Sequence, residues 1–308
     1  MMKAARIHDY GAPLVLEEVP VLEIGPDEVL VRVKAVALNP LDVQLHSGRM
    51  HGFFPLAFPY TLGTDLAGTV ERAGASATRW RGGEAVVART DPKKGGALAE
   101  FAVVPAADLA AAPKGASLEE AAGLPTAAGT AWQALFEVAD LQRGQTILVH
   151  AGAGGVGSFA IQLARNAGAR VIATASGAGM EVARQLGADQ VIDYRSERFE
   201  DRLSDLDVVL DTVRDDTQQR SFGVLRPGGA LVSTTAPPDE ALAKAHKISA
   251  SFVFHKSDGS RLQKIVERID AGTLKVLVDR TVPLEALDDA FRHQGSGRAR
   301  GKIILSVS

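Results

Sequence analysis

The chain has 308 residues, of which 46% are hydrophobic and 23% charged, and its formal net charge is -3. This near-neutral charge argues against a nucleic-acid partner, no apolar run approaches the roughly 18 residues that span a bilayer, and the first residues lack the apolar core of a secretory signal. Because the sequence contains no cysteine, disulfides, thiolate nucleophiles and cysteine-bound metals are excluded. These properties predict a cytoplasmic enzyme of two domains, without nucleic-acid binding or membrane insertion.

The first hundred residues are typical of a small β-rich domain. Val29, Val31 and Val33 fall on one side of an expected strand that follows a Gly25-Pro26 turn. Similar short runs, separated by Gly or Pro, lie at 14–16, 66–70, 85–88 and 98–104. Several short strands at this spacing favour a small barrel or sandwich.

Helix signals begin at Ser117. Ser117 and Glu120 form a capping-box pattern, in which the two side chains satisfy the first backbone N–H groups of a helix. Residues 126–138 predict a second helix, with Ala131, Leu135 and Val138 on one side.

A strand, a glycine-rich turn and a helix follow between Gln145 and Gly168. The apolar run 147–149 is typical of a buried parallel strand, and apolar residues recur at helical spacing up to Gly168. Between them, a G-x-G-x-x-G pattern is formed by Gly152, Ala153, Gly154, Gly155, Val156 and Gly157. Such glycines let backbone N–H groups reach a pyrophosphate at the positive end of a helix dipole, so the order predicts a dinucleotide site. A purely structural turn and the similar glycine loop of methyltransferases are the alternatives.

The end of the next expected strand, 169–175, indicates which dinucleotide binds. NAD sites place an Asp or Glu on the ribose about 20 residues past the glycine pattern, and here Ala175, Ser176 and Gly177 occupy that place. No carboxylate repels a 2′-phosphate, so NADPH is favoured over NADH. The missing acid also counts against a methyltransferase. The alternative is that the alignment is off by two residues and that the ribose-binding acid lies elsewhere. Asp189 and Asp193 come too late in the sequence to take that role easily.

Strands and helices then alternate, as in a doubly wound parallel sheet. Helices are expected at 180–187 and 221–225, and strands at 190–192, 207–211 and 230–233. The tail predicts an amphipathic helix at 260–271, another helix at 284–293 and a strand at 302–305. We infer that this tail returns to the first domain. The predicted fold class is α/β, with a β-rich domain at 1–122 that is completed by 260–308, and a Rossmann domain at 123–259.

Motifs along nearly the whole chain resemble the medium-chain dehydrogenase/reductase superfamily, in its zinc-free quinone oxidoreductase branch, which is zeta-crystallin-like. Besides the glycine pattern, they are the segments 25–33, 39–42, 63–68, 130–135 and 296–302. The resemblance implies a GroES-like catalytic domain, a Rossmann domain, a cleft between them and a homodimer formed through the Rossmann sheet edges.

Zinc is not expected. Where zinc-dependent members of the superfamily have their ligands, this chain has Asn39, Thr64 and a residue near Thr126. Zn²⁺ prefers Cys, His or carboxylate ligands, so these positions argue against a metal. His46 and His51, five apart in an expected loop, are an alternative metal pair, although loop histidines are more often solvated.

Without a metal or an evident catalytic base, the cofactor has to carry the chemistry. The resemblance implies hydride transfer from NADPH to a quinone. One alternative is reduction of the carbon–carbon double bond of a 2-alkenal or enone. The other is an NADPH-binding structural or regulatory protein without turnover, as some zeta-crystallin relatives suggest.

The resemblance also implies site residues. The expected cofactor contacts are Asn39, Thr130, Gly152, Ala153, Gly154, Gly155, Val156, Gly157, Thr174, Ser176, Tyr194, Thr212, Val213, Ser233, Phe252, Val253, Phe254 and Lys302. The expected acceptor pocket contains Asn39, Gln44, Met50, Tyr60 and Phe254, and His46, His51, Phe53 and Phe54 are further candidates. Each has a structural alternative: Ser176 as a turn residue, Tyr194 as a surface aromatic, Phe252 and Phe254 as core.

Two features depart from the family pattern. Met180 stands where relatives often have the lysine that pairs with the 2′-phosphate. Either a cation comes from elsewhere, with Arg184 and Arg195 as candidates, or the preference for NADPH is only modest. Gln44 and Met50 stand where bacterial quinone reductases of this type often have tyrosines, which predicts a different acceptor pocket.

Overall fold

The computed structural model describes residues 1–213 and 216–307, and the chain forms two compact units. Unit 1 comprises Met1–Thr126, Ser257–Gly272 and Val276–Ser308, and unit 2 comprises Ala127–Lys256 and Thr273–Lys275. The chain thus builds unit 2 from its middle and completes unit 1 with its tail. None of the helices in the described part combines the length and hydrophobicity that crossing a bilayer requires.

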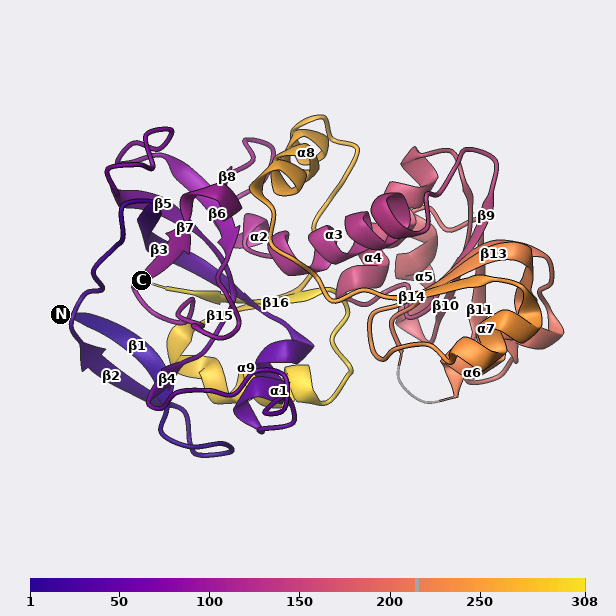
Figure 1. The fold of residues 1–308 in the computed structure, drawn as a ribbon, viewed down its shortest axis with the longest axis horizontal. Coiled ribbons are helices and arrows are strands. Elements are labelled where there is room, and N and C mark those ends of the chain that lie inside the picture. The colour runs from indigo at the N-terminus through magenta and orange to yellow at the C-terminus, as the bar shows by residue number, and fades with distance from the viewer. Residues whose placement is uncertain (214–215, 308) are drawn as a thin grey trace. The chain divides into compact units, whose positions relative to one another are not determined.

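Two β-sheets form the frame of unit 1 (Figure 1). The larger has seven strands in the order β15-β16-β3-β5-β6-β8, with β7 also paired to β3, and the smaller has the order β2-β1-β4. The strands are β1 Met2–Ile7, β2 Val15–Val19, β3 Glu28–Leu38, β4 Tyr60–Thr61, β5 Asp65–Ala73, β6 Ala85–Arg89, β7 Phe101–Pro105, β8 Ala110–Ala111, β15 Val278–Pro283 and β16 Lys302–Ser306.

Strand β3 is central to unit 1 because it pairs with β5, β7 and β16, which come from three separate parts of the sequence. Its alternating valines are buried in the core, as their period of two predicts. The helices of this unit are α1 Pro40–His46, η1 Ala106–Asp108, α2 Leu118–Ala121, α8 Gly259–Asp270, η5 Leu284–Ala286 and α9 Leu287–Gly295.

Unit 2 contains a six-stranded sheet in the order β11-β10-β9-β12-β13-β14, in which every neighbouring pair is parallel. The strands are β9 Thr146–Val149, β10 Arg170–Ala175, β11 Gln190–Asp193, β12 Leu206–Asp211, β13 Leu225–Ser233 and β14 Ser249–Phe252. The chain moves outward from β9 in one direction and from β12 in the other. The switch point therefore lies at the ends of these two strands, where ligands bind in such sheets.

Helices connect the strands of unit 2, with α4 and α5 contacting β9, β10 and β11, and α6 and α7 contacting the other half of the sheet. The helical segments are α3 Pro125–Trp132, η2 Gln133–Val138, α4 Gly155–Asn166, α5 Ala178–Gln185, η3 Phe199–Asp201, α6 Thr217–Ser221, η4 Phe222–Val224 and α7 Glu240–His246. This architecture confirms the predicted α/β class, with a parallel Rossmann sheet.

Most predicted elements are present, including the capping box, in which Ser117 and Glu120 exchange bonds at the start of α2. The single helix expected at 126–138 is instead an α-helix followed by a π-helical segment, η2. The expectation that His46 lies in a loop is wrong, because it is the last residue of α1. The start of α1 is marked by Pro40 and by the Asp42 carboxylate, which accepts the Asn39 N–H. The helix was not predicted because its seven residues are too few to show an apolar periodicity.

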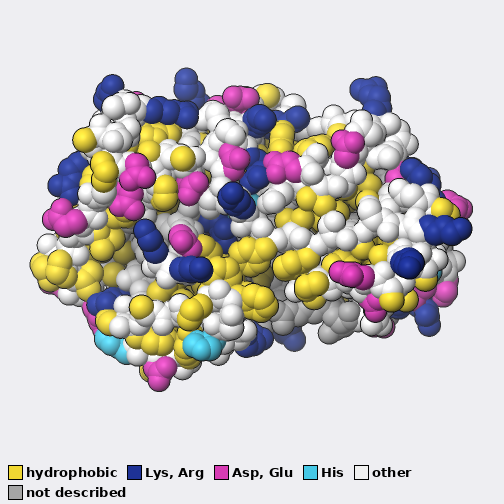
Figure 2. All heavy atoms as spheres, in the orientation of Figure 1, with side chains coloured by type: hydrophobic (Ala, Val, Ile, Leu, Met, Phe, Trp, Pro, Cys, Tyr) yellow, Lys and Arg dark blue, Asp and Glu magenta, His cyan; other side chains and the backbone are white. Residues whose placement is uncertain are grey.

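Charges of both signs are interspersed on the molecular face drawn in Figure 2, in keeping with the net charge of -3.

Candidate functional site

The glycine pattern lies at the switch point of the sheet, between β9 and α4. Ala151 has a left-handed backbone, with φ of 50°, and starts the turn. A Cβ built on Gly157 would overlap the Ala151 carbonyl oxygen, and one on Gly152 would come within 2.8 Å of the Ala173 Cβ. The turn therefore requires glycine at both positions.

The first turn of α4 offers unsatisfied backbone donors. Its N-cap is Gly154, which has no side chain to cap the helix. The first N–H groups of a helix have no partner within the helix, and in a twelve-residue helix they form the positive end of the dipole. The N–H groups of Gly155 and Val156 can thus bind a pyrophosphate oxygen.

The adjacent strand ends carry a hydroxyl pair. The Ser176 Oγ donates to the Tyr194 Oη at 3.0 Å, which joins the residue after β10 to the residue after β11. Tyr194 is 55% exposed, so its ring is open to a ligand. The strand register pairs Ala175 with Asp193, whose carboxylate accepts the Arg195 N–H. No carboxylate follows β10 directly, because Ala175, Ser176 and Gly177 stand there.

The two candidate cations differ in their surroundings. The Arg184 guanidinium is 3.4 Å from the Glu181 carboxylate, one turn earlier in α5. Arg195 is exposed beside Tyr194, and its guanidinium makes no ion pair among residues 1–213 and 216–307. Met180 is half-buried on α5 and supplies no charge.

Asp211, which sequence reasoning missed, organises the ends of β12 and β13. Its carboxylate accepts from the Val213 N–H at 3.0 Å and from the Ser233 hydroxyl at 2.9 Å. Burial raises the pKa of Asp211, and these hydrogen bonds oppose the rise. The Thr212 hydroxyl donates to the His150 carbonyl oxygen at 2.8 Å. These hydrogen bonds fix Thr212, Val213 and Ser233 at the switch point.

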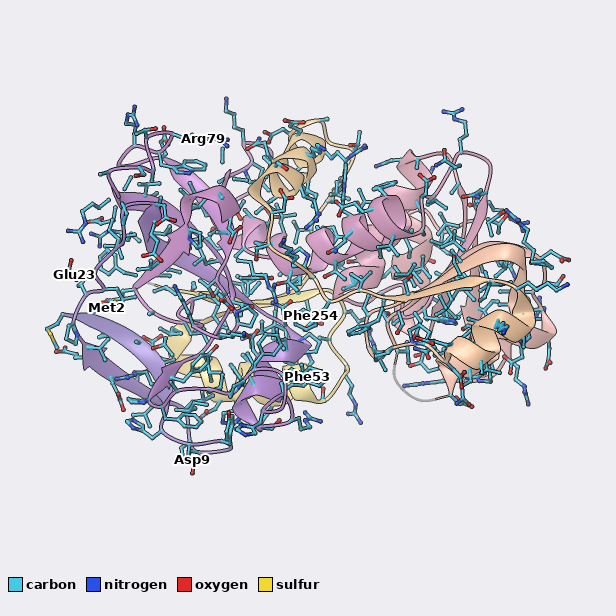
Figure 3. The ribbon with its side chains drawn as sticks, in the orientation of Figure 1. Met2, Asp9, Glu23, Phe53, Arg79 and Phe254 are labelled. Atoms are coloured by element: carbon cyan, nitrogen blue, oxygen red, sulfur yellow. The ribbon has the colours of Figure 1, made fainter. Side chains whose placement is uncertain are left out.

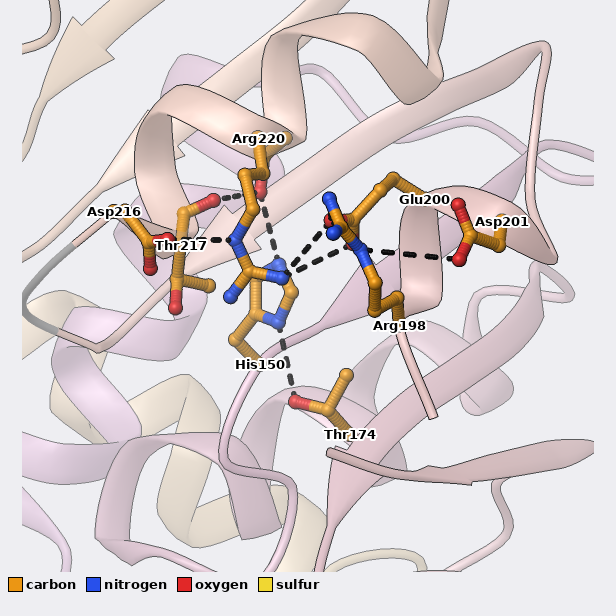
Figure 4. Close-up of polar contacts among 9 residues, drawn as sticks. His150, Thr174, Arg198, Glu200, Asp201, Asp216, Thr217 and Arg220 are labelled. Carbon is orange, nitrogen blue, oxygen red and sulfur yellow. Dashed lines mark hydrogen bonds and ion pairs between the residues drawn. The ribbon is translucent and has the colours of Figure 1, made fainter. Parts of the chain in front are cut away.

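His150, also missed, lies directly before the glycine turn and is fully buried. Its Nδ1 is 3.1 Å from the Thr174 Oγ1 and its Nε2 is 3.0 Å from the Ser221 Oγ (Figure 4). Burial lowers the pKa of His150 to about 3, and the nearby Arg220 guanidinium adds to the effect, so the ring is neutral. The Thr174 hydroxyl, expected at the cofactor, faces His150 and accepts the Ala151 N–H at 3.2 Å.

The remaining expected residues of unit 2 lie on α3 and at the sheet edge. Thr130 is 5% exposed within α3. The Val253 N–H donates to the Ser233 carbonyl oxygen, which brings the end of β14 to the end of β13. Phe252 and Phe254 are 39% and 41% exposed, so the alternative of two core residues is wrong. Phe254 is labelled in Figure 3.

In unit 1, two of the positions that match zinc ligands, Asn39 and Thr126, belong to a polar cluster around the buried Lys302. The Lys302 ammonium donates to the Asn39 Oδ1 at 2.5 Å and to the Leu38 carbonyl oxygen at 2.9 Å, and it lies 3.6 Å from the Asp65 carboxylate. Asp65 also accepts the Asn39 amide at 3.0 Å and the Thr126 hydroxyl at 2.5 Å. Burial lowers the pKa of Lys302, and Asp65 opposes this.

These residues do not fit a zinc ion. Asn39 and Thr126 contribute an amide and a hydroxyl, and the Asp65 carboxylate is already opposite the ammonium of Lys302. No group of three or more His, Asp or Glu side chains that could hold a metal occurs in the described part of the chain. His46 and His51 bind other partners, the Ala12 carbonyl oxygen and the Tyr10 hydroxyl respectively.

The expected acceptor residues of unit 1 are distributed between core and surface. Tyr60 is 3% exposed, and its hydroxyl donates to the Pro92 carbonyl oxygen at 2.7 Å. Gln44 is half-buried on α1, and Met50 and Phe54 are half-buried against the core. Phe53, in contrast, is 75% exposed (Figure 3).

Two family models match the chain. Residues 25–114 match the alcohol dehydrogenase GroES-like domain, and residues 186–305 match a model described as zinc-binding dehydrogenase. The second description contrasts with the cluster around Lys302, where Asn39 and Thr126 are not ligands that zinc prefers.

Similar proteins cover nearly the whole chain. It is 36% identical to the NADPH-dependent alkenal/one oxidoreductase of Arabidopsis thaliana, across 99% of this chain and 79% of the relative. It is 33% identical to the chloroplast envelope quinone oxidoreductase homolog of the same plant, across 99% and 98%.

Solved structures show the same fold. An alcohol dehydrogenase superfamily protein from Novosphingobium aromaticivorans superposes with a TM-score of 0.93, at 32% identity and full coverage of both chains. Mycobacterial Rv1454c, complexed with NADPH, gives a TM-score of 0.89 at 28% identity, again with full coverage. Together with the family models, these similarities show that the chain belongs to the medium-chain dehydrogenase/reductase superfamily, among its quinone oxidoreductase-like members.

Proposed function

We propose that this oxidoreductase uses NADPH to reduce a quinone, without a metal ion. The observation that carries the proposal is the uncapped first turn of α4 beside the Ser176–Tyr194 pair, in a place where no carboxylate follows β10. The NADPH-complexed structure and the NADPH-dependent relative support the choice of cofactor.

Arg195 is the proposed partner of the 2′-phosphate. Arg184 is already paired with Glu181, whereas Arg195 follows Tyr194 and has no ion pair among the described residues. A guanidinium binds phosphate with two parallel hydrogen bonds. A single arginine can therefore take the role of the lysine that relatives often have at the position of Met180.

NADPH, when bound, supplies a hydride from C4 of its nicotinamide. The residues of this chain then have to bind and orient rather than donate a strongly acidic proton. The N–H groups of Gly155 and Val156 hold the pyrophosphate, and Asp211 fixes the strand ends beside it. A proton for the reduced acceptor can come from solvent or a hydroxyl.

Enone reduction is a second candidate, since one relative is named as an alkenal/one oxidoreductase. Both reactions consume NADPH, so the acceptor separates them. Stopped-flow measurement of NADPH oxidation against a panel of quinones and α,β-unsaturated carbonyls tests both. Quinone turnover is the expected result. A saturated carbonyl as the main product would replace the quinone proposal by the enone one, and NADPH binding with no turnover would indicate a structural or regulatory protein.

Cofactor selectivity has its own test, in which Ser176→Asp places a carboxylate after β10. We expect wild type to bind NADPH more tightly than NADH, and the variant to lose at least about tenfold of that preference, because the added charge repels the 2′-phosphate. Calorimetric titration measures both affinities. Ser204→Asp, at an exposed serine of unit 2, is the matched control and should leave the preference unchanged. Equal NADPH and NADH affinities in wild type would reject our interpretation of this strand end.

We also propose a homodimer. Strand β14 is an edge strand of the sheet in unit 2, with exposed Phe252 at its end. Such an edge can pair with a second copy. Sedimentation equilibrium that shows only monomer at micromolar concentrations would contradict this. Location in the cytoplasm stays a prediction, since several relatives are named as chloroplast or mitochondrial proteins.

A further inference from the structure

The buried His150 links the glycine turn to α6 through both ring nitrogens. On one side Thr174, near the end of β10, lies between the ring and the Ala151 N–H. On the other side Ser221, the last residue of α6, lies between the ring and the Thr217 carbonyl oxygen, to which it donates at 2.7 Å. The side chains of His150, Thr174 and Ser221 are at most 3% exposed, so water cannot replace these partners.

The donors and acceptors permit one polarity. The Ser221 hydroxyl gives its hydrogen to Thr217, so it can only accept from His150, whose Nε2 has to carry the proton. The neutral ring then has Nδ1 as an acceptor, and the Thr174 hydroxyl donates to it. This leaves the Thr174 oxygen to accept the Ala151 N–H.

Other contacts hold the ring in place. The His150 ring meets the Phe199 ring edge-on, with the centroids 4.8 Å apart. The Arg220 guanidinium is 5.0 Å from the Phe199 ring. It also pairs with the Glu200 carboxylate (Figure 4). The His150 ring is thus packed as well as hydrogen-bonded, which fixes its orientation.

We propose that His150 is a positioning residue for the nucleotide: a directed hydrogen-bond chain from Ala151 through Thr174, His150 and Ser221 to Thr217 holds the start of the glycine turn in its binding conformation. The proposal rests on the proposed function in that it assumes a nucleotide on this turn. Ala151 is the residue that needs to be held, because an alanine with φ of 50° is disfavoured without support. Its carbonyl oxygen also lies against Gly157, so a change at Ala151 alters the first turn of α4.

The first test is the protonation state. Nitrogen-15 spectra of histidine-labelled protein at neutral pH, with His150 assigned from the spectrum of His150→Gln, should show a neutral ring protonated at Nε2. Ser221→Ala should abolish the preference for this tautomer. An Nδ1–H tautomer or a charged ring in wild type would overturn the proposal.

The second test is affinity. Thr174→Val removes the hydroxyl that joins His150 to Ala151, and we expect the Kd for NADPH to rise roughly threefold to tenfold, as for the loss of one hydrogen bond. Thr174→Ser keeps the hydroxyl and should recover most of the lost affinity. Ser221→Ala should raise the Kd similarly, and the double variant should bind more tightly than the product of the two effects predicts, because both act through one ring.

Thr146→Val is the matched control, since Thr146 begins β9 at the other end of the sheet and should leave the Kd within about twofold of wild type. Melting curves of all variants identify any that fail to fold. If Thr174→Val is among them, the NADPH affinity of Thr174→Ser relative to wild type decides whether the hydroxyl is needed. An unchanged Kd in folded Thr174→Val would overturn the proposal. Wild type that binds no NADPH would reject the proposed function instead, while the nitrogen-15 spectra still report on the hydrogen-bond chain.

Discussion

Replacing Asp42 by asparagine should stabilise unit 1 at neutral and alkaline pH. Asp42 lies in the first turn of α1, three residues after the N-cap Asn39, and is completely buried. One carboxylate oxygen accepts the Asn39 N–H at 2.7 Å, and the other has no hydrogen-bond partner among the described residues. Burial raises the pKa of Asp42 to about 7, although the Asn39 N–H opposes the rise and the nearby Asp65 carboxylate adds to it.

The magnitude follows from proton linkage. Below pH 3.8, the ordinary pKa of an aspartate, the carboxyl is protonated in both the folded and the unfolded chain. In this range its ionisation takes nothing from the free energy of unfolding. Between 3.8 and about 7 the unfolded chain releases the proton and the folded chain keeps it, so the free energy of unfolding falls as pH rises. At about 1.4 kcal/mol for each pH unit, the loss reaches about 4 kcal/mol above neutrality. The asparagine side chain of the Asp42→Asn variant has no proton to release, and its amide oxygen can still accept the Asn39 N–H.

Unfolding of unit 1 can be followed by its own fluorophore. The chain has two tryptophans, and Trp80 is in unit 1 while Trp132 is in unit 2. In a Trp132→Phe background, urea titrations read at Trp80 should give similar stabilities with and without the Asp42→Asn substitution near pH 4, and a gap of about 4 kcal/mol in favour of asparagine near pH 8. Asp27→Asn, at an exposed aspartate of the same unit, is the control and should show no growing gap. A gap that is constant with pH, or that favours aspartate near pH 8, would refute the assignment of a neutral buried carboxyl.

Two further variants test unit 2. Gly157→Ala should lower the NADPH affinity by more than about tenfold in calorimetric titration, because its Cβ would displace the Ala151 carbonyl. Gly223→Ala is the matched control, because a Cβ at Gly223 meets nothing within 4 Å. Equal losses of affinity in both variants would contradict the steric argument. Phe159→Ala, in the fully buried face of α4, should cost about 3 to 5 kcal/mol in unfolding followed at Trp132, and a loss below about 1 kcal/mol would show that the site collapses without a cavity.

The repeating parts of the fold were predictable because their residues obey a simple period. The apolar run before the glycines predicted β9, the helical spacing after them predicted α4, and the capping box at Ser117 predicted α2. Strand β1 was not predicted, because its alanines have little strand preference and it is defined by pairing with β2 and β4. The π-helical segment after Trp132 was missed because its residues continue the apolar spacing of an α-helix.

The candidate site divides in the same way. The glycine turn and the serine after β10 could be predicted because both follow from the order of residues along one continuous stretch, from β9 through α4 to the end of β10. His150 and Asp211 are visible only in three dimensions. Their partners, such as Ser221 for His150 and Ser233 for Asp211, come from other strands and helices, so no spacing in the sequence marks them.

The cluster around Lys302 explains how this fold keeps its polar groups buried where other members of the superfamily hold zinc. A buried carboxylate needs a compensating positive charge, and Asp65 faces the Lys302 ammonium at 3.6 Å. The Asn39 amide and the Thr126 hydroxyl donate hydrogen bonds to the Asp65 oxygens, and the Asn39 Oδ1 accepts one from Lys302, so these groups are paired without a metal ion. The lysine comes from β16, at the far end of the chain from Asn39, so the cation arrives only when the tail completes unit 1. Charge balance in this cluster is therefore coupled to folding of the unit, whereas in a metal site it depends on the supply of the ion.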